Sequence, residues 1–481
     1  MLKVLSEDPG SQLMAQSYDR LTNIWKASVT SIWPAFHGRN AISNVFQHMM
    51  DIGYESLNPV NHIIATKLIH YSNDIEKLSL KIAEGDASAT RKLYDLQSKY
   101  ILTDKRGHKW TVGEMVTVAK NNAIAFNPNI IGQMDVMNSS RDMVDFVMDD
   151  LYPKLGAHSF PKKKYAQMVN PLSQKFIPFR VGRSVGNYVE WQSRLVDFTA
   201  NLRKTGDVEQ SAFQTKQFLF DYQNLTAFER NFMRRIIPFY TWTRKNIEMQ
   251  VQTLVTKPGR IGVFNHGTQS VGDVWGMGAM SQEERDLLPD WMVDSLNVVI
   301  GREGNKLTLL TTLGTPFEAP FQQLGNLMGS INPLIKMPVE GVTGYSFFNG
   351  KALSEVTNAT AFSGPMVPDA LKDFIGYTEV KYKDKSGVEN TLYISLKPEN
   401  MNIFNNLPFT PRTLSTLKLL ESPNVPEQIK VLQLLFGIKP YDVDLEKEAA
   451  RRSKELQTQL EDLLDKAGLG YKFTRFQLTE E

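Results

Sequence analysis

The stretch from Phe218 to Ile247 constrains the fold more than any other part of the chain. Thr226 followed three residues later by Glu229 is a capping box, which opens a helix. Pro238 ends that helix within about three turns, because proline lacks the backbone donor and clashes with the preceding turn. The aromatic residues that follow the break directly are Phe239, Tyr240 and Trp242. The sequence therefore predicts a tight helical corner.

Positive charges crowd both arms of this corner. They are Arg230, Arg234 and Arg235 before the break and Arg244 and Lys245 after it. The last two fall in the first turn of a second expected helix, Thr241–Thr256, where a cation opposes the helix macrodipole. A compensating anion is therefore expected. It is either a carboxylate of the corner itself, from Asp221 or Glu229, or an external carboxylate or phosphate, so Arg234, Arg235, Arg244 and Lys245 are candidate contacts.

Helical periodicity extends over most of the remaining chain. Residues 17–33 place Leu21, Ile24, Trp25, Ser28 and Ile32 on one face, and Pro34 ends that helix. Further helices are expected at 41–53, at 73–100 with a break near Gly85, at 111–125, at 138–150 and at 187–205. Ser281 and Glu284 form a second capping box. Near the C-terminus, Asp442 or Asp444 caps a helix over 446–466 with a leucine-rich stripe.

Strand patterns are few. Val298–Thr312 alternates around Arg302-Glu-Gly-Asn305, and Glu379–Leu396 does the same around Asp384-Lys-Ser-Gly387, which predicts two hairpins. The expected fold is mainly α, an elongated multi-helix protein with two small β-hairpin insertions. We expect five regions: an N-terminal helical domain (1–150), a basic Pro- and aromatic-rich arm (151–189), a helical corner domain (190–260), a Gly- and Pro-rich mixed region with the hairpins (261–400) and a C-terminal helical region (401–481).

Residues 151–189 differ sharply in composition from their neighbours. They hold seven cations and no acid, with prolines at 153, 161, 171 and 178 and interleaved aromatic residues, a pattern that indicates an extended arm. Such an arm suits an acidic neighbouring subunit, nucleic acid or an anionic membrane surface, and these alternatives stay open. The candidate contacts in it are Lys162, Lys163, Lys164, Lys175, Arg180 and Arg183.

The composition excludes several classes of protein. With 42% hydrophobic and 22% charged residues, the chain is an ordinary folded protein and not a disordered one. A net charge of +2 means that any electrostatic partner is met by a local patch. There is no cysteine, which excludes disulfides and thiolate chemistry. The first residues do not predict a secretory leader, and prolines within Leu307–Ile335, the longest nearly uncharged stretch, argue against a membrane span.

Sequence motifs for catalysis are missing. There is no phosphate-binding loop ending in Gly-Lys-Ser/Thr, no Gly-x-Ser-x-Gly elbow and no His-Glu-x-x-His. His62 and His70 could share a helix face, but carboxylates at ligand spacing do not accompany them. We therefore expect a protein that is not an enzyme and that has no cofactor and no metal.

Four sequence blocks together resemble the large polyvalent proteins of tailed bacteriophages. The first is Asp221-Tyr-Gln-Asn-Leu-Thr-Ala-Phe-Glu-Arg230 followed by Pro238-Phe-Tyr-Thr-Trp-Thr-Arg-Lys-Asn246-Ile. The others are Pro34-Ala-Phe-His-Gly-Arg-Asn-Ala-Ile-Ser-Asn44, Ile331–Glu340 with Phe347–Gly350, and Leu435–Asp444. The block residues that stand out as a structural motif are Arg39, Asn40, Asn44, Asp221, Thr226, Glu229, Arg230, Pro238, Trp242 and Asn246.

The resemblance implies a virion protein without a defined catalytic activity. It implies an internal capsid or portal-associated protein that acts in genome packaging organisation or DNA ejection, and assembles as a homo-oligomer with other virion proteins. Phage DNA and, on ejection, the host membrane are further expected partners. The expected location is the virion, inside the capsid or at the portal vertex, with passage through the host cell during assembly and through the host envelope on infection. The alternative is a nucleic-acid- or membrane-binding protein that acts through the arm 151–189.

Overall fold

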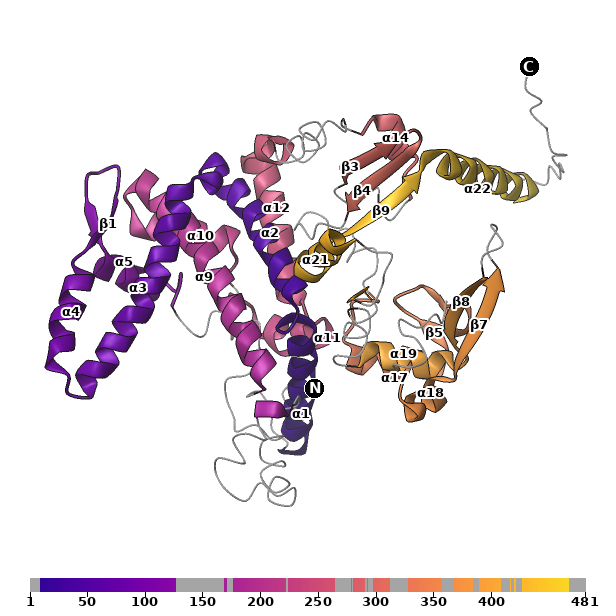
Figure 1. Cartoon of the computed structure of the whole chain (residues 1–481), viewed down its shortest axis with the longest axis horizontal. Helices are drawn as coiled ribbons and strands as arrows, with labels where there is room; N and C mark the ends of the chain where they lie inside the picture. The colour runs from indigo at the N-terminus through magenta and orange to yellow at the C-terminus, as the bar shows by residue number, and fades with distance from the viewer. Residues whose placement is uncertain are drawn as a thin grey trace. The chain divides into compact units, whose positions relative to one another are not determined.

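The protein is mainly α-helical, with small antiparallel β-sheets, as the sequence predicts (Figure 1). The computed structural model describes residues 9–126, 168–170, 176–221, 224–263, 278, 280–289, 292, 297–311, 328–356, 367–383, 389–407, 416, 419–420 and 426–466. The chain forms two compact units. The first comprises Met1–Ile261 and Ala319–Gly437, and the second comprises Gly262–Glu318 and Ile438–Glu481. The expected division into five regions stays a prediction.

Helices from the first 220 residues build the main core of the first unit. They are α1 (Pro9–Thr30), α2 (Pro34–Asp51), α3 (Pro59–Ala83), α4 (Ala87–Gln97), α5 (Val112–Asn121), α9 (Ile177–Thr205) and α10 (Val208–Phe218), with a short 3₁₀ turn η2 (Gly53–Leu57). Leu68 of α3, Met115 of α5 and Phe198 of α9 are fully buried together. The strands β1 (Tyr100–Thr103) and β2 (Lys109–Thr111) pair across the turn at Asp104–Gly107.

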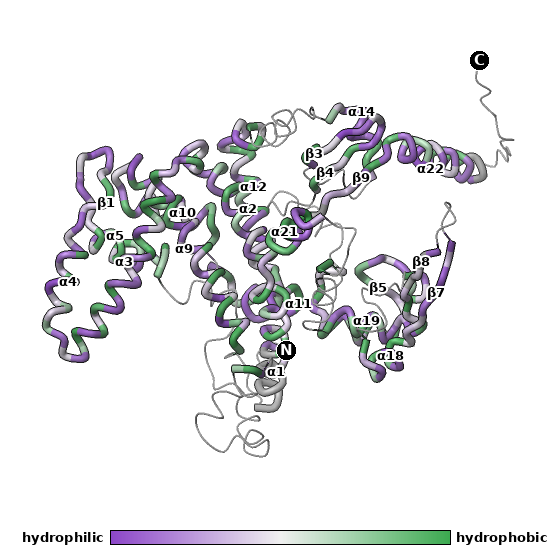
Figure 2. Tube along the Cα trace, viewed as in Figure 1, coloured by the Kyte–Doolittle hydropathy of each residue, from purple (hydrophilic) through white to green (hydrophobic). Residues whose placement is uncertain are grey.

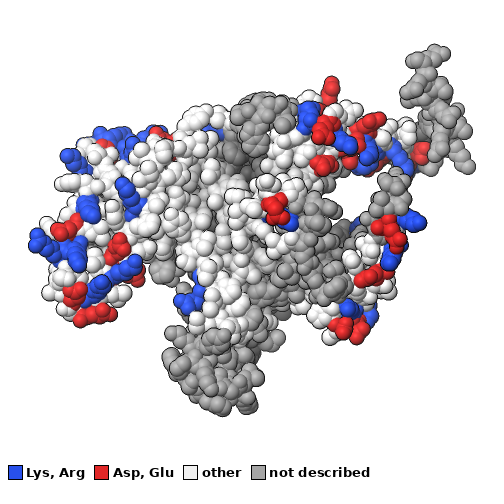
Figure 3. All heavy atoms as spheres, in the orientation of Figure 1, with Lys and Arg blue, Asp and Glu red and all other residues white. Residues whose placement is uncertain are grey.

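Local signals explain where these helices begin and end. Asn58, Asp86 and Thr111 accept hydrogen bonds from backbone N–H groups in the first turns of α3, α4 and α5, and Gly206, with φ of 66°, ends α9. The break expected near Gly85 separates α3 from α4, as predicted. On the face seen in Figure 3, charged side chains of both signs gather over α3 and α4, which identifies this hairpin as a solvated face.

The start of α9 corrects one expectation. The sequence predicts an extended arm up to residue 189, whereas the helix begins at Ile177 and carries Arg180 and Arg183 in its first turns. Pro178 does not break this helix, because a proline in the first turn lacks only an N–H that has no intrahelical partner anyway. Lys162, Lys163, Lys164 and Lys175 lie outside the described residues, as does the helix expected at 138–150.

The helical corner follows α10. Residues 227–228 are α-helical, Glu229–Met233 form a π-helical turn (η3), and Arg234–Ile236 return to α-helix (α11). Pro238 is buried in the break, and α12 (Tyr240–Thr256) leaves it. The predicted corner is confirmed, and the π-helical turn is an addition that the sequence does not signal.

The rest of the first unit consists of short elements. They are α17 (Pro333–Thr343), β5 (Tyr345–Ser346), β6 (Lys351–Ala352), the 3₁₀ turn η4 (Leu353–Glu355), α18 (Asp369–Ile375), β7 (Tyr377–Lys383), β8 (Glu389–Ser395), α19 (Pro398–Asn406) and α21 (Glu427–Phe436). The strands pair antiparallel as β5–β6 and β7–β8, and the second pair is the predicted hairpin. Ile375, Met401 and Phe404 form a small core between α18 and α19.

The second unit contains a three-stranded antiparallel sheet in the order β3-β4-β9. β3 (Val298–Glu303) and β4 (Lys306–Thr311) are the predicted hairpin, and β9 (Lys439–Asp444) adds an edge strand that was not expected. Leu307, Leu309 and Val443 are buried in its core. The capping box at Ser281 opens α14 (Gln282–Asp286), as predicted, and its Glu284 is paired with Arg302 of β3.

The last helix, α22 (Leu445–Lys466), is opened by Asp444, which accepts from the N–H of Lys447 at 3.3 Å. Hydrophilic and hydrophobic residues alternate along it (Figure 2). Leu445 at its start packs against the core of the second unit, whereas Leu456, Leu460 and Leu463 farther along are 61%, 47% and 63% exposed. In the described part of the chain, no helix is both long enough and apolar enough to cross a lipid bilayer.

Candidate functional site

The helical corner is organised around the carboxylate of Glu229. Its Oε2 accepts from the backbone N–H and the hydroxyl of Thr226, both at 2.8 Å, while the Thr226 hydroxyl accepts from the N–H of Glu229. The other oxygen accepts from the Tyr240 hydroxyl at 2.9 Å and pairs with Arg244 at 2.8 Å. The predicted capping box is confirmed, and the same carboxylate also joins the two arms of the corner.

These contacts explain the electrostatics of Glu229 and its neighbours. Hydrogen bonds from Thr226 lower the pKa of the Glu229 carboxyl, because they favour its charged form. Burial, and then its bond to Glu229, raises the pKa of the Tyr240 hydroxyl. Arg244 also pairs with Glu248 at 3.1 Å, as Lys245 does at 3.4 Å. Carboxylates of this chain therefore compensate the positive charges of Arg244 and Lys245 in the first turn of α12. For Arg244, the prediction that a carboxylate of the corner is the compensating anion is confirmed, and that carboxylate is Glu229.

Other residues of the corner block have structural surroundings. Asn246 is fully buried on α12 and accepts from the side-chain amide of Gln250 at 3.1 Å. Trp242 is half-buried, as is Asp221, which follows the last turn of α10. Phe220, in the turn after α10, has a positive φ of 51°, and the Arg194 guanidinium donates to its carbonyl at 2.8 Å.

Arg235 links the corner to α1. Its Nε and Nη2 donate to the two oxygens of Asp19 at 2.7 and 2.6 Å, a bidentate geometry that matches a guanidinium to a carboxylate. The backbone carbonyl of the same arginine accepts from the Tyr18 hydroxyl at 2.7 Å. Asp19 holds the pKa of Arg235 above its ordinary value, chiefly through this hydrogen bond. Arg235, expected as a contact for a partner, is therefore used within the chain.

A polar pocket of about 210 Å³ lies between α1 and residues 230–235. Its lining contains four cationic side chains and one carboxylate, together with three neutral polar residues: Lys26, Arg230, Arg234 and Arg235; Asp19; and Thr22, Asn23 and Asn231. Burial, and then the positive charge of Arg230, lowers the pKa of the Arg234 guanidinium. The structure thus gathers the three arginines that the sequence places before Pro238, and adds Lys26, which no sequence signal indicates.

The third block packs directly against the corner. The N–H of Asn332, immediately before α17, donates to the Ile236 carbonyl at 2.7 Å. The fully buried Asn332 side chain donates to the Thr22 hydroxyl at 2.9 Å and to the Arg235 carbonyl at 3.2 Å. One asparagine therefore ties α1, the corner and α17 together. Farther along α17, the buried Glu340 accepts from the N–H of Phe347 and from Asn402 of α19.

The block at 34–44 packs in the same way against the start of the block at 435–444. The Arg39 guanidinium donates to the carbonyls of Phe436 and Gly437 at 3.1 and 2.7 Å, so it satisfies acceptors at the C-terminal end of α21. Gly38 allows this approach, because a Cβ there would collide with the Leu435 carbonyl. Asn44 is buried and donates to the Ser193 hydroxyl of α9 at 2.7 Å, whereas Asn40 is half-buried.

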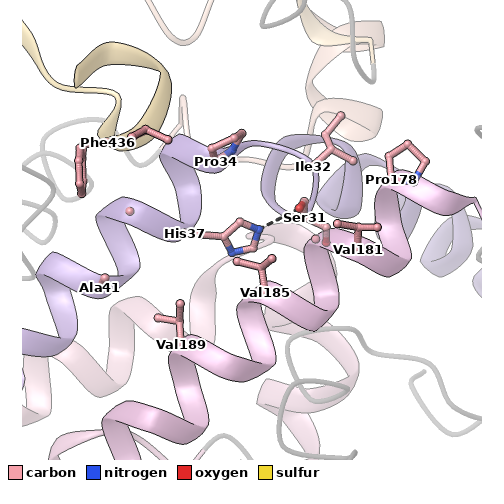
Figure 4. Close-up of a pocket in the computed structure, with 13 residues that line it drawn as sticks. Ser31, Ile32, Pro34, His37, Ala41, Pro178, Val181, Val185, Val189 and Phe436 are labelled. Carbon is pink, nitrogen blue, oxygen red and sulfur yellow. Dashed lines mark hydrogen bonds between the residues drawn. The ribbon is translucent and has the colours of Figure 1, made fainter. Parts of the chain in front are cut away.

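An apolar groove of about 590 Å³ runs along this junction (Figure 4). Its walls come from α2, α9 and α21, with Val181, Val185 and Val189 on the α9 side. His37 projects from α2 toward α9, and its Nε2 lies 2.9 Å from the Ser31 carbonyl. Gly182 brings α9 against the backbone of Ser31, since a Cβ at this position would overlap that carbonyl.

The first turns of α9, which contribute Pro178, Val181 and Gly182 to this groove, also carry the two described arginines of the expected basic arm. Arg180 is exposed and Arg183 is half-buried on the first turns of α9. The apolar side chains of Ile177, Val181 and Val185 on the same turns are 43%, 57% and 44% exposed. The start of α9 therefore presents both cations and apolar groups to solvent.

Sequence reasoning missed a buried pair of carboxyl groups, Asp51 at the end of α2 and Asp197 in the middle of α9. The amide of Asn201 donates to both, at 2.7 and 3.1 Å, and Lys257 pairs with Asp51 at 3.1 Å. Burial and the charge of Asp51 raise the pKa of Asp197 well above its ordinary value. The sequence does show one sign of a buried acid, because Asp197 lies within the apolar stretch Leu195–Phe198. It does not indicate the partner, because Asp51 lies 146 positions earlier in the chain.

His62 and His70 do not form a metal site. His62 contacts the Ser56 carbonyl and the Gln192 amide, and His70 contacts the Thr66 carbonyl. Within the described ranges, no group of three or more His, Asp or Glu side chains is arranged to hold a metal ion. Compared with family models, with curated proteins and with solved structures, the chain has no significant match.

Proposed function

We propose that this chain is a structural, non-enzymatic protein of a tailed-bacteriophage virion, an internal protein at the capsid interior or portal vertex that acts in genome packaging organisation or DNA ejection. The proposal starts from the resemblance of its four sequence blocks to the large polyvalent proteins. One structural observation supports it most: polar residues of these blocks serve as cross-links between distant segments. Arg39 bonds to Gly437, and Asn332 bonds to Thr22 and to the corner.

This use of polar side chains is the reason for favouring a structural role. A catalytic constellation keeps its acid, base or nucleophile accessible to a substrate. Here the oxygens of Glu229 already accept from Thr226, Tyr240 and Arg244, and both oxygens of Asp19 accept from Arg235. Assembly in several copies with other virion proteins gives such a scaffold its role, and the exposed leucine stripe of α22 offers surface for those contacts.

The decisive experiment is quantitative mass spectrometry of purified phage particles, with the infected-cell lysate as the control sample. We expect the chain in intact particles at a fixed ratio to the portal protein, and reduced in particles that have ejected their DNA. Its absence from washed particles, together with abundance in the lysate, would contradict a virion role.

The start of α9 favours a second candidate function, binding to nucleic acid or to a membrane through residues 151–189. Arg180 is exposed there beside exposed apolar side chains. Flotation with vesicles that contain or lack anionic lipid tests the membrane case, and the salt dependence of DNA binding tests the nucleic-acid case. Replacing Lys162, Lys163 and Lys164 together by Ala is expected to weaken whichever binding occurs, whereas unchanged binding would exclude the arm.

A further inference from the structure

The second half of α22 is exposed on all sides. Every residue from Ser453 to Leu463 is exposed to solvent, whereas Leu445 at the start of the helix packs against the core of the second unit. A short helix is only marginally stable in water, because most helical stability in proteins comes from the packing of an apolar face. The exposed half of α22 would therefore gain stability from a surface that packs against it.

That half carries an apolar stripe. Leu456, Leu460 and Leu463 are 61%, 47% and 63% exposed, and their spacings of four and three residues place them on one face of the helix. This is the spacing of the apolar positions in a two-stranded coiled coil, where each leucine packs between side chains of the facing helix. Single exposed leucines are ordinary, but three in line on an otherwise hydrophilic stretch form an interaction surface.

The charges of α22 fit a second copy that runs antiparallel. Residues 451–454 contain three cations and no acid, whereas residues 459–463 contain two acids and no cation. In an antiparallel pair, the basic stretch of each copy lies beside the acidic stretch of the other, and the opposite charges attract. A parallel pair would place like charges side by side, which disfavours that orientation.

The residues that flank the stripe are compatible with their own copies. If Leu456 of one helix lies opposite Leu460 of the other, the two-fold axis passes at the level of Thr458. Gln457 and Gln459, one on each side of the stripe, then each lie beside the same residue of the second copy. A charged side chain at such a position would repel its copy, whereas a side-chain amide both donates and accepts and so can pair with another amide.

We propose that α22 pairs with α22 of a second copy of this chain in an antiparallel helical dimer, with Leu456 and Leu460 at its centre. In this register Leu463 packs beside Ser453 of the other copy. The inference deepens the assembly role proposed above by naming the partner, and it rests on that role for its purpose. A chain that dimerises but is absent from particles would overturn the virion role alone, and a chain that is present in particles but monomeric in solution would overturn the dimer alone.

Sedimentation velocity of the full chain over a series of concentrations tests the pairing. We expect the wild type to dimerise and Leu460→Asp to weaken the dimer by at least about 100-fold, because each dimer would bury two unpaired carboxylates. Thr458→Asp is the matched control, since it places the same charge on the opposite, polar face and should dimerise as the wild type does. Both positions are exposed, and circular dichroism of each variant checks the fold. A wild type that stays monomeric, or equal association of the wild type and Leu460→Asp, would overturn the proposal.

The orientation of the pair can be tested with single cysteines, because the chain has none of its own. A short bismaleimide should join Gln459→Cys to its copy, since the antiparallel register places the two side chains beside each other. Ser453→Cys should not be joined, because the two copies of this residue would lie about 15 Å apart along the helix. Joining of Ser453→Cys would show a parallel pair, and joining of neither variant would place the contact elsewhere, so either result would overturn the proposal.

Discussion

Several buried polar side chains of the first unit form hydrogen bonds with partners on other helices. His48 and Asn44, one turn apart on α2, both bond to Ser193 of α9, the histidine through the backbone carbonyl at 3.0 Å. Asp197, also on α9, accepts from Thr215 of α10 at 2.9 Å. These groups fix how the helices face each other, and their protonation is coupled to folding.

His48 should make the fold sensitive to acid. Burial lowers the pKa of its imidazole from 6.5 to about 4, so the native state favours the neutral ring. The stability that follows is present above pH 6.5 and is lost as the pH falls from 6.5 toward 4, by about 3 kcal/mol in total. Glutamine does not titrate in this range and can keep the hydrogen bond to Ser193. The His48→Gln variant should therefore lose about 3 kcal/mol less stability than the wild type between pH 6.5 and pH 4.

Urea unfolding at a series of pH values between 4 and 7 measures this effect. The control is His70→Gln, because His70 is exposed on α3. Parallel pH profiles for the wild type and His48→Gln would contradict the prediction.

Asp197 should act in the opposite direction. Burial and the negative charge of Asp51 raise the pKa of Asp197, so the native state favours the protonated form. The contribution to stability is complete below the ordinary aspartate pKa of 3.8 and is lost as the pH rises through the raised value. Asp197→Asn mimics the protonated group, and we expect its advantage over the wild type to grow with pH.

Thermal unfolding at stepwise higher pH checks this expectation. Asp95→Asn, on the exposed face of α4, serves as the control. A stability difference between Asp197→Asn and the wild type that does not change with pH, or that shifts in favour of the wild type as the pH rises, would contradict the prediction.

At the scale of elements, glycines decide how closely the helices approach. Gly38 brings α2 against the end of α21, and Gly182 brings α9 against the turn after α1. Each faces a backbone carbonyl, which cannot move aside as a flexible side chain can. Both glycines also line the apolar groove beside His37.

Gly182→Ala should therefore be strongly destabilising, by about 3 kcal/mol or more, because its methyl group would overlap the Ser31 carbonyl. Gly341→Ala is the matched control: Gly341 lies inside α17, and nothing is near its Cβ position. That variant should be neutral or slightly stabilising, since alanine favours helix. Equal unfolding temperatures for the two variants would refute the close approach.

At the scale of the whole molecule, the two units are assembled from interleaved stretches of chain. The second unit takes 262–318 from the middle and 438–481 from the end, and β9 joins them by pairing with β4. Each unit has its own buried core. Separate cores predict that each unit can lose structure without the other.

Val443→Asp tests this independence, because it places a charge in the core between β9 and β4. In hydrogen–deuterium exchange, we expect faster exchange in β3 and β4 and unchanged protection in α3 and α9. The control is Thr308→Ser on β4, a half-buried position where the change keeps the hydroxyl that bonds to Asp442. Simultaneous loss of protection in both units would show that they unfold as one.

Much of the local structure was determined by the sequence itself. The capping boxes at Thr226 and Ser281, the break at Pro238 and the hairpin turn at Gly304 all depend on side chains within a few residues of the backbone they shape. Such interactions need no distant partner, so the corner, both predicted hairpins and the mainly helical class follow from them. The prediction of an extended arm at Pro178 was wrong for an equally local reason: a proline can either lie in the first turn of a helix or break a helix.

The tertiary structure decided everything that joins distant segments. The bond from Arg39 to Gly437, the edge strand β9, the pairing of Asp51 with Asp197 and the entry of Lys26 into a pocket of arginines each need the chain to close a long loop. Periodicity indicates which face of a helix is apolar, but not which helix covers it or which buried polar groups meet there. The sequence alone thus left the partner of each cation at the corner open, and packing assigned Glu229 to Arg244 and Asp19 to Arg235.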